Sequence, residues 1–157
     1  MQVGATAEKL KELGVHTVGI VATNADRARL FFRFRPPRVP VGADPELDTH
    51  RAYGLPRSAI TPEILAAVES KARELAQKLK VEITPAGAYD TIGRLDGFTP
   101  AESDHAEFEK HQAQLTGLFL VDKAGVVRWN FIEAQRGPES VTEFPTDNEV
   151  LAAARAL

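Results

Sequence analysis

The 157-residue chain contains no cysteine. Disulfides, thiolate metal sites and a cysteine nucleophile are therefore excluded for this polypeptide, since each needs a thiol or a thiolate. The sequence also has no apolar run near the roughly 20 residues that a membrane-spanning helix needs. Its first fifteen residues lack the apolar core of a secretory signal. We therefore expect no membrane span, and a cytoplasmic location is the default expectation.

The composition is that of a folded protein. The chain is 43% hydrophobic and 26% charged, with a net charge of only -3, which does not fit an intrinsically disordered segment. A chain of this length can bury one sizeable core. We expect a single domain over residues 1–157.

Arginines are concentrated in residues 27–38. Such a run can attract phosphates or other anions, but no interleaved glycines or nucleic-acid motif accompany it, so nucleic acid is not a favoured partner. The alternative interpretation is the solvated face of a helix. The candidate anion-binding residues are Arg27, Arg29, Arg33, Arg35 and Arg38.

Apolar spacing predicts alternating helices and strands in the first third of the chain. A helix over residues 3–13 should end at Gly14, and the β-branched run at 15–22 is typical of a strand covered on both faces. A short helix should follow Asn24 or Asp26 and end before Pro36. An edge strand is expected at 39–43 and another short helix from 44 to about 51.

Residues 58–112 are expected to form a mainly helical insertion. Thr61, Pro62 and Glu63 are a strong helix start, and that helix should run to about Lys80. Residues 81–98 should be an irregular connection, followed by a polar helix at 99–110. The expected apolar face of the long helix consists of Ile64, Leu65, Val68, Ala72, Leu75, Ala76 and Leu79.

The last third of the chain gives the clearest local signals. Residues 117–121 and 126–131 form a β-hairpin pattern around Gly125, which can adopt positive φ. Thr146 and Glu149 are spaced as a capping box for a closing helix. The order of elements predicts a three-layer α/β/α fold with mixed strand directions.

Several segments follow one another in a familiar order: HTVGIVA at 16–22, VGADP at 41–45, YGL at 53–55, TGLFLVD at 116–122, GVVR at 125–128 and FPTD at 144–147. They resemble landmarks of the peroxiredoxin-like (alkyl hydroperoxide reductase/thiol-specific antioxidant, AhpC/TSA) branch of the thioredoxin superfamily. The resemblance is collinear over most of the chain, apart from the insertion at 58–112. It implies a thioredoxin-like fold.

The resemblance also implies a thiol-dependent reductase of peroxides or disulfides. The working cysteine of that family lies at a helix N-terminus, where backbone N–H groups favour the thiolate. The corresponding helix is residues 3–13, so the cysteine is expected upstream of residue 1. Thr116 stands where peroxiredoxins often carry an arginine and thioredoxins a cis-proline. It is a candidate vestigial site residue, although a threonine at a strand start is also ordinary.

One or two strands expected before that helix are also absent. In the family, such a strand lies between those equivalent to 15–22 and 117–121. Without it, these two strands must pair directly, accept a strand from another chain or leave edges exposed. We expect a homodimer or a repacked sheet.

Other catalytic constellations are weak. His105 and Glu109, and Glu107 and His111, are spaced for one helix face, but no third ligand is evident. No nucleophile elbow, phosphate loop or Rossmann glycine pattern is present. We expect neither a metal site nor a cofactor.

Two functional hypotheses follow. The first is a redoxin of the antioxidant and thiol-disulfide oxidoreductase family, inactive as this cysteine-free chain; a full-length form would use a thiol reductant as partner. The second is a non-catalytic binding module on the same scaffold, with the contact surface at 27–38 or 61–110. A weaker third is an anion or nucleotide binder that uses the arginines.

Overall fold

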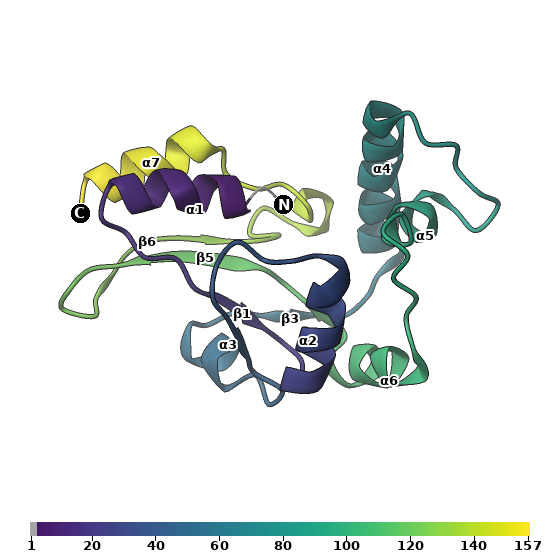
Figure 1. Ribbon diagram of the computed structural model, residues 1–157, viewed down its shortest axis with the longest axis horizontal. Coiled ribbons are helices and arrows are strands. Elements are labelled where there is room, and N and C mark those ends of the chain that lie inside the picture. Colours follow the sequence, from purple (N-terminus) through teal and green to yellow (C-terminus); the bar gives the residue numbers. More distant parts are fainter. Residues whose placement is uncertain (1–2) are drawn as a thin grey trace. The chain divides into compact units, whose positions relative to one another are not determined.

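The computed structural model describes residues 3–157 (Figure 1). These residues divide into two compact units. The first contains the chain up to Leu55 together with Thr116–Ile132 and Phe144–Leu157, and the second contains Pro56–Leu115 and Glu133–Glu143. The second unit includes all of the expected insertion and adds a segment from the C-terminal part of the chain.

The first unit combines a parallel and an antiparallel strand pair with helices. Strands β1 and β2 are parallel, with Gly19 opposite Val41, and β5 and β6 are antiparallel, with Gly117 opposite Ile132. The expected α/β class and the mixed strand directions are confirmed. The elements are α1 (Val3–Glu12), β1 (Gly19–Val21), α2 (Ala25–Phe34), β2 (Val41–Ala43), α3 (Asp48–Ala52), β5 (Gly117–Val121), β6 (Val127–Ile132) and α7 (Asp147–Arg155).

Local signals explain where these helices begin and end. Gly14, at φ +78°, ends the first helix, and the N–H of Val15 donates to the carbonyl of Leu10. Asn24 caps α2 by accepting the N–H of Arg27 at 2.9 Å. The expected capping box of α7 is confirmed.

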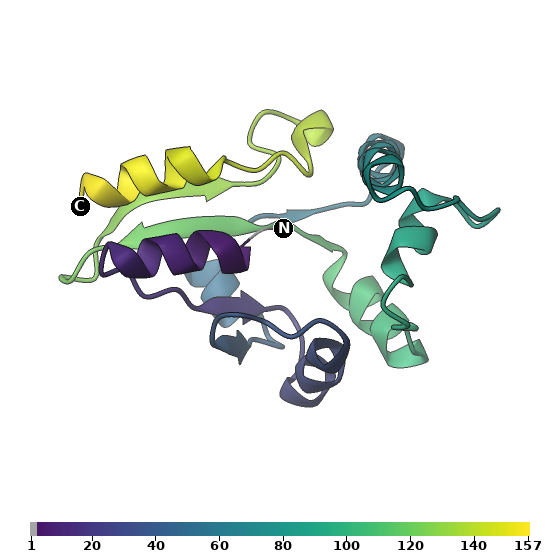
Figure 2. The same cartoon turned by 45° about the horizontal axis from the view of Figure 1, so that its top comes forward.

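The core of the first unit lies where α1 and α7 pack against the β5–β6 hairpin (Figure 2). Asp147, at the start of α7, also accepts hydrogen bonds of 2.6 Å from both Thr6 and Lys9 of α1. Burying apolar side chains there removes them from water, which is the main stabilising term for such a layer. The buried residues are Leu10, Leu120, Val150, Leu151 and Ala154.

The strand pairs of the first unit do not join into one sheet. Within residues 3–157, β1 pairs only with β2, and β5 pairs only with β6. Direct pairing of the two inner strands, one of the three outcomes expected for the absent strand, does not occur within these residues. The strand expected at 15–22 is also shorter than expected, at Gly19–Val21.

The second unit is mainly helical, and its buried cluster consists of Ile64, Leu115 and Val141. The long helix expected from Thr61 is confirmed, but its apolar face is divided. Ile64, Ala72 and Ala76 are buried and Val68 is half-buried, whereas Leu65, Leu75 and Leu79 are exposed. The elements are β3 (Arg57–Ser58), α4 (Pro62–Leu79), α5 (Ala88–Gly93), α6 (Glu102–His111), β4 (Ala113–Gln114) and the 3-10 helix η1 (Pro138–Ser140), with β3 and β4 antiparallel.

The expectation that residues 81–98 are irregular is wrong in part, because α5 lies within them. The carboxylate of Glu69 on α4 accepts the N–H of Ala88 at 2.9 Å and that of Tyr89 at 3.0 Å. These are the free donors of the first turn of α5. The cap comes from a residue 19 positions away, so no local pattern signals it.

Across residues 3–157, none of the helices is both long enough and apolar enough to cross a membrane.

Candidate functional site

The first turn of α1 borders a groove beside β1. The groove has a volume of about 480 Å³ and is mostly apolar. The side chain of Arg38 lies against Gly4, because a methyl group added there would come within 2.9 Å of Arg38 Cδ. The lining residues are Gly4, Ala5, Gly19, Ile20, Val21, Phe32, Pro36, Pro37, Arg38, Val39 and Val41.

This end of α1 is electropositive. Helix N-termini carry a partial positive charge from unpaired N–H groups. Arg38 carries a full positive charge, and the aliphatic part of its side chain lies against Gly4 in the same turn. Among the expected anion-binding residues, it is the one that the structure places at a helix start and on the groove.

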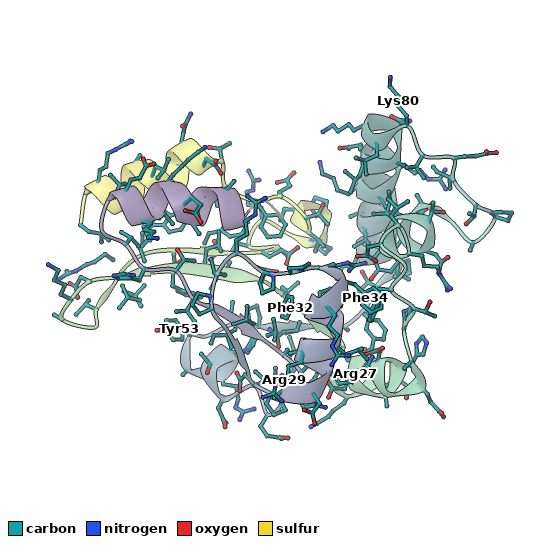
Figure 3. The ribbon with its side chains drawn as sticks, viewed as in Figure 1. Arg27, Arg29, Phe32, Phe34, Tyr53 and Lys80 are labelled. Atoms are coloured by element: carbon teal, nitrogen blue, oxygen red, sulfur yellow. The ribbon has the colours of Figure 1, made fainter. Side chains whose placement is uncertain are left out.

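The other candidate arginines do not gather at this groove. Arg29 pairs with Asp26 at 2.8 Å on the solvent side of α2, and it also borders a second hollow of about 260 Å³ together with Phe32. The guanidinium of Arg35 lies 4.7 Å from the centre of the Phe31 ring. Figure 3 shows Arg27 and Arg29 near the same end of α2. Anion binding by these residues stays a prediction.

Thr116 is half-buried and directly precedes β5. The start of this strand is tightly packed, since a methyl group on Gly117 would lie 2.5 Å from Leu55 Cδ2 and 2.6 Å from Phe119 Cε2. The rings of Tyr53 and Phe119 are 4.8 Å apart, centre to centre. The strand start next to Thr116 is therefore apolar, and a role for its hydroxyl in binding stays a prediction.

The strongest polar cluster of the first unit was not expected from the sequence as a site. Asp44 and His50 are both 8% exposed, and Asp44 Oδ2 lies 2.8 Å from His50 Nδ1. An ionised carboxylate only accepts hydrogen bonds, so Nδ1 carries the proton. The carboxylate also accepts the backbone N–H groups of Asp48, Thr49 and His50.

These contacts lower the pKa of Asp44. Burial raises the pKa, but the hydrogen bond from His50 and the backbone N–H groups of α3 together outweigh it. The carboxylate is therefore ionised at neutral pH. It fixes the first turn of α3 and orients the imidazole.

Among residues 3–157, no group of three or more His, Cys, Asp or Glu side chains is arranged to hold a metal ion. His111 is buried at the end of α6, and its Nδ1 has no hydrogen-bond partner in the described part of the chain.

Comparison with known proteins gives one result. A family model described as AhpC/TSA antioxidant enzyme matches residues 4–135, which run from the first turn of α1 to just beyond β6. No curated protein and no solved structure matches the chain.

Proposed function

Since this chain belongs to the AhpC/TSA antioxidant enzyme family, we propose that it is a redoxin scaffold for thiol-dependent antioxidant chemistry that has no thiol turnover of its own. The nucleophile in such chemistry is a thiolate, and residues 1–157 contain no cysteine. The thiol must therefore come from outside these residues.

The observation that carries the proposal is the electropositive first turn of α1. A thiolate placed there is favoured by the helix N–H groups and by Arg38, which lies against Gly4. The adjoining groove of about 480 Å³ leaves room for the segment or molecule that supplies the sulfur.

Peroxide consumption by the purified chain tests the proposal. With hydrogen peroxide and excess dithiothreitol, we expect the rate to equal that of buffer, because no protein thiolate is available. Saturable turnover that scales with protein concentration would contradict the proposal. Turnover that disappears on metal chelation or on repeated purification is assigned to contaminants.

The second candidate is a non-catalytic binding module, favoured by the exposed apolar side chains of α4. Leu65, Leu75 and Leu79 are 57%, 41% and 52% exposed. Replacing all three with Gln keeps the helix and removes the apolar surface. Loss of captured partners in the triple variant, with unchanged circular dichroism, supports a contact surface on α4; unchanged capture argues against it.

The proposal includes two partners and a location. A second copy of the chain is proposed as a structural partner, because β1 and β5 each leave one edge unpaired in the described residues. A small thiol reductant or a reducing protein is the proposed partner for the thiol-dependent reduction.

A cytoplasmic location is part of the proposal because thiols stay reduced there.

A further inference from the structure

Helix α2 has two distinct sides. Ala28 is buried, and Phe32 lines the hollow of about 260 Å³ together with Val41 of β2. An α-helix turns by about 100° per residue, so Leu30, two positions from both Ala28 and Phe32, lies on the opposite side. This side points away from the strands, so a further strand of the sheet would not fill it. We call it the outward face, and it is formed by Arg27, Leu30, Arg33 and Phe34.

Two large apolar side chains lie at the centre of the outward face. Leu30 is 37% exposed and Phe34 is 42% exposed. They are four positions apart, which makes them neighbours on the helix surface. Figure 3 shows Phe34 and Phe32 on opposite sides of α2. The side of a helix that meets only water is normally polar, so adjoining exposed leucine and phenylalanine indicate a contact surface.

Arginines border the apolar pair on both sides. Arg27 is three positions before Leu30 and Arg33 is three positions after it, so each lies next to the apolar side chains. Residues 25–38 contain five arginines and one aspartate, a net charge of +4, whereas the rest of the chain carries -7. The outward face therefore has the charge that attracts a negatively charged partner.

The partner must also accept the apolar side chains between the arginines. Nucleic acid would pair with the arginines through its phosphates, but it offers no partner for Leu30, since bases stack on aromatic rings. Residues 25–38 also contain no Asn, Gln, Ser, Thr or Tyr, which supply many of the polar contacts at nucleic-acid interfaces. A lipid surface accepts both kinds of side chain, because arginines pair with anionic headgroups while apolar side chains enter the boundary with the acyl chains.

We propose that the outward face of α2 binds anionic lipid headgroups at a membrane surface. The inference goes beyond the proposed function, since it concerns where the chain is held and requires no thiol. It describes a helix that lies on the membrane, not one that crosses it.

Vesicle sedimentation tests the proposal with the unchanged chain. Vesicles of phosphatidylcholine with phosphatidylserine should bind the chain, and vesicles of phosphatidylcholine alone should bind it much more weakly. Binding should fall steeply as the salt concentration rises, because salt screens the attraction between arginines and headgroups. Absence of binding to the anionic vesicles at low salt would overturn the inference.

A charge variant locates the contact on α2. Arg27→Gln with Arg33→Gln should weaken binding to anionic vesicles roughly 30-fold, the effect of two basic residues at such a surface. Lys11→Gln with Arg155→Gln is the matched control, because it removes the same charge from exposed positions of α1 and α7. It should have little effect, and equal losses in the two double variants would overturn the inference.

An apolar variant tests the centre of the outward face. Leu30→Gln with Phe34→Gln keeps the charge and should weaken binding by about tenfold or more through lost apolar burial. Val126→Gln with Val127→Gln is its control, since these residues are 46% and 41% exposed in the β5–β6 hairpin. Circular dichroism and the urea midpoint show that each variant is folded. Equal binding by the two variants would contradict a lipid contact at Leu30 and Phe34.

A fluorescent variant reports insertion directly. The fluorescence of Phe34→Trp should be quenched by lipids with brominated acyl chains. That of the unchanged chain should not, because its one tryptophan, Trp129, packs against the core of the first unit. An unquenched Phe34→Trp that sediments with the vesicles would overturn the inference.

A single-stranded oligonucleotide provides the competing partner. If it binds the unchanged chain more tightly than anionic vesicles do, and the arginine double variant loses that binding, the outward face is a nucleic-acid site and the inference is wrong. None of these results bears on the peroxide assay, so the inference and the thiol proposal fail independently.

Discussion

The carboxylate of Asp44 and the imidazole of His50 form a buried hydrogen bond of 2.8 Å that closes the loop between β2 and α3. The same carboxylate accepts three backbone N–H groups at the start of the helix. One side chain thus satisfies donors that would otherwise be buried without partners, which is costly in a folded protein. The pair holds the segment after β2 in place.

Replacing this carboxylate should destabilise the protein. Asp44→Asn keeps the shape, but the amide of Asn can present only one oxygen, so some of the N–H donors lose their acceptor. We expect a clear fall in the urea midpoint of unfolding. Asp26→Asn is the matched control, because Asp26 is exposed and pairs only with Arg29 in the described contacts. Equal midpoints for the two variants would show that the buried pair has no special role.

Acidification should also reduce stability. The hydrogen bonds from Lys9 and Thr6 lower the pKa of Asp147, and the contacts of His50 and α3 lower that of Asp44. A carboxyl group with a lowered pKa in the folded state contributes stability above its unfolded value of about 3.9, and this contribution is lost as pH falls through the folded value. The urea midpoint should therefore fall between pH 5 and pH 2.5. In an Asp44→Asn, Asp147→Asn double variant, the urea midpoint should fall less steeply with decreasing pH. The same pH dependence in the double variant and the unchanged chain would contradict the assignment of the acid sensitivity to these two carboxyl groups.

The cap that Glu69 provides should decide whether α5 is formed. Glu69→Gln removes the charge and one of the two acceptor oxygens that face Ala88 and Tyr89. The amides of the first turn of α5 should then exchange with solvent faster, while those of α4 stay protected. Glu74→Gln, which removes exposed charge interactions with Lys71 and Lys78 on the same helix, is the control. Unchanged exchange in α5 would show that the helix forms without the cap.

Leu10 anchors α1 on the hairpin and α7. It is 6% exposed, so Leu10→Ala should cost about 2–5 kcal/mol of unfolding free energy through lost burial and a cavity. Leu13, at the end of the same segment, is 40% exposed, and Leu13→Ala should cost less than about 1 kcal/mol. Urea titration measures both, and similar losses would mean that Leu10 is not a core residue in solution.

Elements with local signals were predictable from the sequence. Thr146 and Glu149 form a reciprocal cap because the pattern needs only residues three positions apart. Gly125 occupies the hairpin turn at φ +81°, as its lack of a side chain allows. The long helix after Thr61 also follows from local capping and composition.

Features that depend on distant partners were not predictable in this way. Helix α5 needs Glu69, and the β3–β4 pair joins Arg57 to Gln114 across the whole insertion. The Asp44 and His50 pair lies within one short segment, but its burial depends on the tertiary fold. In the described residues β1 and β5 belong to separate strand pairs, and this pairing depends on contacts between distant segments.

We propose that α1 keeps the thiolate-favouring start of a redoxin helix although residues 1–157 contain no cysteine. The most direct test is the thiol pKa of Ala5→Cys compared with that of Glu12→Cys, since both positions are exposed and lie at opposite ends of α1. Ultraviolet titration of the thiolate should give a pKa about one unit lower for Ala5→Cys, because the two helix ends act in opposite directions. Adding Arg38→Ala to Ala5→Cys should raise the pKa of its thiol and so reduce the pKa difference from Glu12→Cys. Equal pKa values for the two thiols would contradict the account.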